Sequence, residues 1–136
     1  MIQPLMKNPM FLSVHSSPAT ADDLPVARDL TDTLLAHADH CVGMAANMIG
    51  VHKRIIVVAT GLAPMVMINP VITKKSGPYT AEEGCLSLMG VRQTTRYKSI
   101  EVDFLGMDMK PRHQAFTDFL AQIIQHEVDH CDGILI

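Results

Sequence analysis

The hydrophobic and polar positions of this chain follow two different periods. Between residues 26 and 38 apolar side chains recur every fourth position, which is the spacing of one helix face. Asp22, Asp23 and Pro25 precede this pattern and suit the N-terminus of a helix, so we expect a helix from about residue 24 to His40. Between residues 99 and 104 apolar and polar side chains alternate, which is typical of a half-buried strand.

The middle of the chain predicts short strands, turns and a loop. The β-branched run 54–58 indicates a buried strand, and 65–72 indicates a second strand that is interrupted at Asn69-Pro70. A turn is expected at Ser76-Gly77-Pro78. The small residues of 41–50 predict a loop whose backbone approaches another part of the molecule closely.

A second helix is predicted from about Gln114 to His130. Its apolar residues occupy most of the helix circumference, so we expect it to be packed on several sides. The remaining narrow polar stripe consists of Asp118, Gln122, Gln125 and Asp129. Short strands and two helices, without a regular alternation of the two, favour an α+β fold in a single domain over residues 1–136.

Composition narrows the functional classes. The net charge is −3 and no long basic run is present, which argues against nucleic-acid binding. The apolar stretches are too short to span a bilayer, and the N-terminal apolar segment is broken by Lys7, Asn8 and Pro9, so we expect a cytoplasmic monomer. The three cysteines are an odd number, which favours free thiols or metal ligands over disulfides.

The strongest chemical signal is the run from His126 to His130. Residues four apart lie on one helix face, so the two imidazoles can bind one metal ion with Glu127 beside it. Both histidines and Glu127 fall on the inward face of the predicted helix, where unpartnered polar groups would cost several kcal/mol. A bound metal removes that cost. The alternative is two core histidines with backbone partners and a glutamate that reaches solvent.

A third ligand is expected from upstream, because only six residues follow His130. Cys85 is the best candidate, since a thiolate binds zinc or ferrous iron well and Gly84 beside it allows a close backbone approach. The alternative is that Cys85 is a small buried hydrophobic residue. The other upstream candidates are Cys41, His37, His40, His113 and the acidic residues.

Three segments resemble the signature motifs of the peptide deformylase family. Glu83-Gly84-Cys85-Leu86-Ser87 and Gln125-His126-Glu127-Val128-Asp129-His130 resemble two of them. Gly43-Met44-Ala45-Ala46, followed by Ile49-Gly50, resembles the first, in which the family has Gly-x-Gly-Leu-Ala-Ala-x-Gln. The order of the three segments agrees with the family, and the resemblance covers about residues 24 to 136.

This resemblance implies antiparallel strands packed around a metal-binding helix. It implies that Cys85, His126 and His130 bind one divalent metal, with Fe²⁺ as the physiological ion and Zn²⁺, Ni²⁺ or Co²⁺ as substitutes. Glu127 matches the family's general acid/base, and the backbone N–H of Leu86 matches a donor to the oxyanion. The implied reaction removes the N-formyl group from the initiator methionine of nascent polypeptides, and the ribosome is one place where the enzyme would meet this N-formylmethionyl substrate.

The first motif departs from the family at Met48, where the family has a glutamine that donates its side-chain amide to the oxyanion. A thioether has no hydrogen to donate, and losing one such donor typically lowers turnover about 100- to 1,000-fold. Asn47 carries an amide but occupies the variable position of the motif. Cys41 for Gly and Met44 for Leu are further departures, so we expect attenuated activity.

Five further residues are weaker candidates. Gly43, Met48 and Arg92 are expected to contact the substrate. The alternatives for Arg92, and equally for Arg96, are contact with the substrate backbone, pairing with an acidic side chain, or a solvated surface position. Glu83 is expected either to orient a ligand histidine, as metal-bound imidazoles usually require, or to be a surface carboxylate.

Two other functions are alternatives to deformylation. In the first, the chain hydrolyses a different acylated amine. In the second, it holds a metal and binds formyl-methionyl peptides without turnover. Retention of Glu127 favours an enzyme, because a binding protein does not require a general base. A general zinc protease usually takes its third ligand from downstream of the second histidine, and this sequence offers little chain there.

Overall fold

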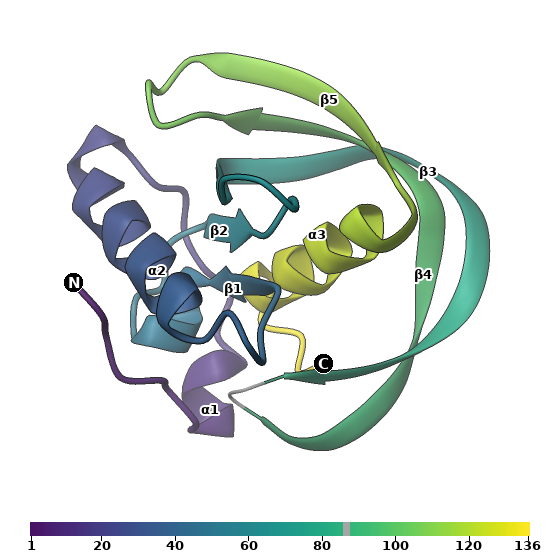
Figure 1. Ribbon diagram of the computed structural model, residues 1–136, viewed down its shortest axis with the longest axis horizontal. Helices are drawn as coiled ribbons and strands as arrows, with labels where there is room; N and C mark the ends of the chain where they lie inside the picture. Colours follow the sequence, from purple (N-terminus) through teal and green to yellow (C-terminus); the bar gives the residue numbers. More distant parts are fainter. Residues whose placement is uncertain (86–87) are drawn as a thin grey trace.

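Five antiparallel strands curl around a central C-terminal helix, α3, in the computed structural model (Figure 1). The structure describes residues 1–85 and 88–136, without the side chains of residues 88 and 89. The predicted α+β class, with antiparallel strands packed around this helix, is confirmed. The sheet order is β1-β2-β3-β4-β5, from strands Gly43–Ala45, Ile55–Val58, Met65–Cys85, Leu88–Leu105 and Pro111–Thr117. The helices are α1 Pro9–Leu12, η1 Ala21–Asp23, α2 Leu24–Ala36, η2 Ala46–Ile49 and α3 Asp118–Cys131.

The short strands β1 and β2 lie between α2 and α3 (Figure 1). Every residue of both strands is buried, because helices cover them from two sides. This explains why the sequence 55–58 reads as a continuous apolar run instead of an alternating one. The expected loop 41–50 therefore contains β1 and η2, and the preceding helix ends at Ala36, one turn before His40.

The hairpin formed by β3 and β4 is longer than the sequence suggested. The turn expected at Ser76-Gly77-Pro78 is wrong, because these residues continue β3 opposite Ser99 and Tyr97 of β4. Gly77 has a positive φ of 73° and thus changes the strand direction without ending the pairing. The alternation over 99–104 is confirmed, with the apolar side chains buried.

The predicted interruption of the strand at Asn69-Pro70 is a register shift within β3. The pairing with β4 skips from Ile68 to Val71, and Asn69 adopts a left-handed φ of 52°. The Asn69 amide bonds to both backbone groups of Ala19: its oxygen accepts from the N–H at 2.7 Å, and its nitrogen donates to the carbonyl at 3.0 Å. The irregular N-terminal segment is thereby fixed to the sheet.

The start of the second helix was predicted too early. Residues 111–117 form β5, in which Phe116 pairs with Ile100 and is buried, and α3 begins only at Asp118. The edge of β4 supplies partners for this segment, and a local helical pattern cannot reveal such a long-range pairing. No helix in the described part of the chain has the length and apolar character needed to cross a bilayer.

Replacing Asn69 by Ala should destabilise the fold in two ways. The change removes two hydrogen bonds and places an alanine at a left-handed φ, so we expect a loss of about 2–4 kcal/mol in the free energy of unfolding. Asn69→Gly removes the same bonds but tolerates the φ, and should be about 1 kcal/mol less damaging. Urea unfolding measures both. Equal stability of Asn69→Ala and the parent chain would contradict this role.

Candidate metal site

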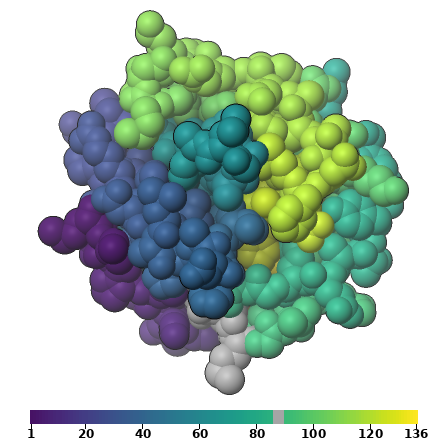
Figure 2. Space-filling model, viewed as in Figure 1, coloured from purple at the N-terminus to yellow at the C-terminus, as the bar shows by residue number. Residues whose placement is uncertain are grey.

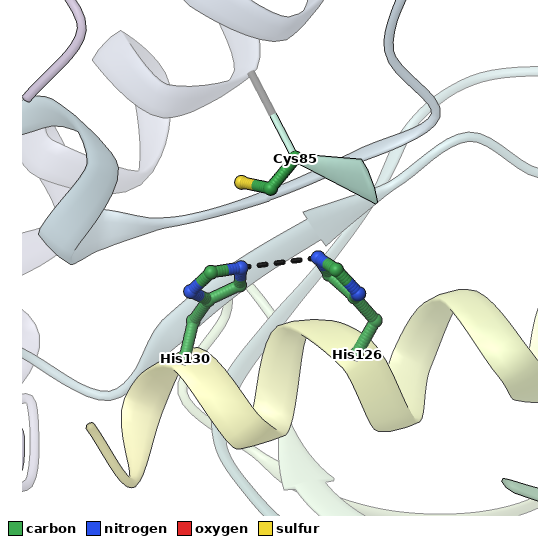
Figure 3. Close-up of side chains that lie close together, drawn as sticks. All are labelled: Cys85, His126 and His130. Atoms are coloured by element: carbon green, nitrogen blue, oxygen red, sulfur yellow. Dashed lines mark hydrogen bonds between the residues drawn. The ribbon is translucent and has the colours of Figure 1, made fainter. Parts of the chain in front are cut away.

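The inward face of α3 carries three buried polar side chains. The exposed fractions of His126, Glu127 and His130 are 8%, 4% and 0%. Cys85, at the end of β3, points toward the two imidazoles (Figure 3). One ligand atom from each of Cys85, His126 and His130 lies within 4.8 Å of the others, and the two Nε2 atoms are 3.0 Å apart. The structure thus brings together the three residues that the sequence proposed as ligands.

A buried ion-pair network orients His126. Its Nδ1 lies 2.7 Å from Oε1 of Glu83, which can only accept, so Nδ1–H donates and Nε2 faces the ligand cluster. Arg96 donates to both oxygens of Glu83, at 2.6 and 2.9 Å, and to Asp129 of α3 at 2.6 Å. Of the two readings of Glu83, the structure supports the one in which this carboxylate orients a histidine.

The charges around the two imidazoles act on them in opposite directions. Burial lowers the pKa of His126, but hydrogen bonds with Cys85 and Glu83 and the charge of Glu127 outweigh it and raise the pKa to about 10. Burial, and then the neighbouring His126, lowers the pKa of His130 to about 3. His130 is therefore uncharged at neutral pH and keeps a lone pair on one ring nitrogen, as a metal ligand must.

The donor set fits a divalent metal ion. Two imidazoles and a thiol converge, and a cation attracted by the surrounding acidic groups would displace the proton from His126. Nδ1 of His130 and Oε1 of Glu127 are buried and have no hydrogen-bond partner among the described residues. A carboxylate oxygen without a protein partner, beside three groups that could bind a metal, can accept a hydrogen bond from a water molecule or a substrate.

Glu127 is held between α3 and β1. Burial raises its pKa to about 7, although the positive charge of His126 acts against this rise. A Cβ atom added at Gly43 would lie 2.7 Å from Cγ2 of Ile123 and 3.0 Å from Oε2 of Glu127. The close backbone approach expected for this segment therefore occurs at Gly43, where β1 passes over Glu127. On the surface, the segment before β1, in blue, lies beside α3, in yellow (Figure 2).

A cavity of about 230 Å³ opens beside this cluster. Cys85, His126 and Glu127 line one side of it, where chemistry can occur. Its apolar wall consists of Val42, Met48, Phe119 and Ile123. The cavity therefore joins an apolar binding space to the candidate metal ligands, as a small-molecule or peptide side-chain site requires.

The residues of the first motif, 43–50, occupy different environments in the structure. Gly43 and Met48 line the cavity, and Sδ of Met48 accepts a hydrogen bond from the N–H of Ala45 at 3.4 Å. The amide of Asn47 instead donates to the carbonyl of His130 at 2.9 Å, so it is committed to the backbone and does not replace a glutamine at position 48.

Two further candidate site residues from the sequence are Leu86 and Arg92. Leu86 lies outside the described residues. Arg92 is half-buried on β4, opposite Glu83 in register, and is not among the described residues that line the cavity. Its expected contact with substrate stays a prediction.

The sequence did not single out Gln122 or Gln125 as functional residues. Gln122 lines the cavity, and its Oε1 accepts from the hydroxyl of Tyr79 at 3.1 Å. Gln122 belongs to the polar stripe of the helical pattern, but it lies four residues before His126, and this spacing indicates a face shared with His126. Gln125, from the same stripe, is buried and bonds to both backbone groups of Tyr97.

Comparison with known proteins identifies relatives of the whole chain. The family model for polypeptide deformylase matches residues 6–136. A peptide deformylase of Clostridium beijerinckii is 54% identical over 136 residues, which is 100% of both chains. The solved class I type b peptide deformylase of Acinetobacter baumannii with bound Met-Ala-Ser is 31% identical with a TM-score of 0.89, over 99% of this chain and 97% of that chain. The same protein with bound actinonin is 33% identical with a TM-score of 0.88, covering 99% and 95%.

Replacing Glu83 by Gln should destabilise the protein strongly. The change removes the negative charge that compensates the buried guanidinium of Arg96, so we expect a loss of about 3 kcal/mol in the free energy of unfolding. Glu82→Gln is the matched control, because Glu82 is an exposed neighbour on the same strand and should change stability by less than about 0.5 kcal/mol. Urea unfolding in the presence of a chelator measures both, and similar values for the two variants would contradict the network.

Proposed function

We propose that this chain, which belongs to the peptide deformylase family, is a metal-dependent hydrolase that removes the N-formyl group from the initiator methionine of nascent polypeptides. The observation that carries this proposal is the meeting of Cys85, His126 and His130 beside the buried carboxylate of Glu127. The adjoining cavity has an apolar wall, which suits the side chain of methionine.

Cys85, His126 and His130 would hold one divalent ion. We propose Fe²⁺ as the physiological metal and Zn²⁺, Ni²⁺ or Co²⁺ as substitutes, because a thiolate with two imidazoles suits all four. When bound, such an ion polarises a carbonyl group and makes water acidic enough to react at neutral pH. The hydrogen bond from His126 to Glu83 fixes the ring so that Nε2 faces the ion.

Glu127 would move the proton. Its carboxylate takes a proton from the water that attacks the formyl carbon, and then gives it to the amine nitrogen as the C–N bond breaks. The products are formate and a peptide with a free amino terminus. A pKa raised to about 7 by burial suits both the accepting and the donating step.

The oxyanion of the intermediate would receive fewer hydrogen bonds than usual. The backbone N–H of Leu86 is the proposed donor, and Met48 supplies none because its thioether carries no hydrogen to donate. Gly43 and Arg92 are proposed as further substrate contacts. The resulting enzyme would be active but slower than one with a glutamine at position 48.

Formate release from a formyl-Met-Ala-Ser peptide tests the function. The protein should be loaded with iron and assayed without oxygen, with the metal content measured in the same samples. Release of formate supports the proposal, and binding of the peptide without release would indicate the alternative of a non-catalytic binder. Hydrolysis only of other acylated amines would indicate the second alternative. The ribosome as the place of action, and the monomeric state, remain predictions.

Replacing Glu127 by Ala or Gln should abolish turnover and leave the metal bound. Because Glu127 is proposed to move the proton and not to bind the metal, we expect kcat to fall at least about 100-fold at an unchanged metal-to-protein ratio. Glu82→Gln controls for the loss of a nearby negative charge. An undiminished kcat in Glu127→Gln would show that another group moves the proton.

Replacing Met48 by Gln should raise the rate. The new amide would offer the oxyanion a donor, so we expect kcat to rise at least about tenfold with little change in KM. Met107→Gln, at a partly exposed position away from the cavity, is the control for introducing an amide. No gain in Met48→Gln, at a preserved melting temperature, would refute the claim that a missing donor limits the enzyme.

A further inference from the structure

We propose that the side-chain amide of Gln122 donates a hydrogen bond to the thioether sulfur of the substrate's methionine, and that Tyr79 holds this amide in place. The inference rests on the proposed deformylase function and names the residue that would distinguish methionine from a hydrocarbon side chain of the same size.

The position of Gln122 on α3 supports this role. Phe119, Gln122, Ile123 and His126 follow the spacing of one helix face, and all four line the cavity. Gln122 lies one turn before His126, which is a displacement of about 6 Å along the helix axis. The amide is therefore displaced by about one turn from the proposed reaction centre, along the same wall of the cavity.

The length of the substrate matches this displacement. Five bonds separate the formyl carbon from the sulfur of formyl-methionine, a span of about 6 Å when extended. A substrate whose formyl group lies beside Glu127 and His126 can thus place its sulfur level with Gln122. The intervening methylene groups would lie against the apolar side chain of Ile123, and the terminal methyl group beyond the sulfur would face Phe119.

The hydrogen bond from Tyr79 sets the direction of the amide. The Tyr79 hydroxyl donates to Oε1 of Gln122 at 3.1 Å, so the carbonyl end of the amide is turned toward β3. No acceptor among the described residues bonds to Nε2, which leaves its N–H groups for a ligand. The thiol of Cys41, another donor at this cavity, is already used by the carbonyl of Gly43 at 2.9 Å.

The chemistry of the sulfur makes the contact selective. A thioether accepts hydrogen bonds weakly, whereas the methylene group of norleucine accepts none. Norleucine is otherwise close to methionine in length and shape. The amide should therefore favour methionine, and an apolar residue at position 122 should not.

The test compares two substrates that differ only at this atom. We would measure kcat/KM for formyl-Met-Ala-Ser and formyl-norleucine-Ala-Ser with the iron-loaded parent, Gln122→Leu and Gln122→Glu. Both variants lose the amide donor, so the ratio of methionine to norleucine should fall about two- to fivefold. Tyr79→Phe, which frees the amide to rotate, should lower the ratio less. Gln114→Leu, at an exposed position on β5, is the matched control and should keep the parent ratio.

A binding measurement provides a readout without turnover. The dissociation constants of Met-Ala-Ser and norleucine-Ala-Ser should differ in the parent and converge in Gln122→Leu. A change in cavity shape alone would weaken both peptides equally and leave their ratio unchanged. An unchanged ratio in both Gln122 variants, in an enzyme that hydrolyses formyl-Met-Ala-Ser, overturns this inference and leaves the proposed function standing. Absence of any deformylation by the metal-loaded parent overturns both.

Discussion

The buried carboxylate of Glu83 is the constraint on which the site depends. It accepts hydrogen bonds from His126 of α3 and from Arg96 of β4, and Arg96 also bonds to Asp129. Three elements are thereby fixed relative to one another. Cys85 lies two residues after Glu83 at the end of β3, so the contact that orients His126 also holds Cys85 beside the imidazoles. One ion-pair network thus sets both the geometry of the candidate metal ligands and the position of the β3–β4 hairpin over α3.

The elements that could be predicted are those in which apolar residues recur at a regular spacing along the sequence. The inward face of α3 and the alternation of β4 follow directly from the spacing of apolar residues. The turn expected at Ser76-Gly77-Pro78 and the helix expected from Gln114 were wrong for a shared reason. Both segments pair with β4, and a local signal from Gly, Pro or Ala does not reveal a partner that lies 12 to 23 residues away along the chain.

In the candidate site, too, local patterns were predictable and long-range contacts were not. The three candidate ligands could be predicted from two short motifs, because a helix spacing of four and a resemblance to one family both point to them. The supporting contacts could not, since Arg96 with Asp129 and Tyr79 with Gln122 depend on the register between the hairpin and α3. Gln122 lies about 40° from His126 around the helix, at the edge of the polar stripe, so the helical pattern alone left its direction open.

Position 48 of this cavity lacks a hydrogen-bond donor, whereas position 122 carries one. The proposed effects of these two positions on the enzyme's kinetics can be measured separately. A donor at position 48 would act on charge that develops only in the transition state, so its loss lowers kcat. The amide of Gln122 would contact a side chain that does not change during the reaction. It would stabilise the bound substrate and the transition state alike, and would therefore appear in KM and in selectivity. A chain with Met48 and Gln122 is thus expected to turn over its substrate slowly and yet to be selective for the thioether. The reason is that position 48 affects the oxyanion of the substrate, whereas Gln122 contacts its sulfur.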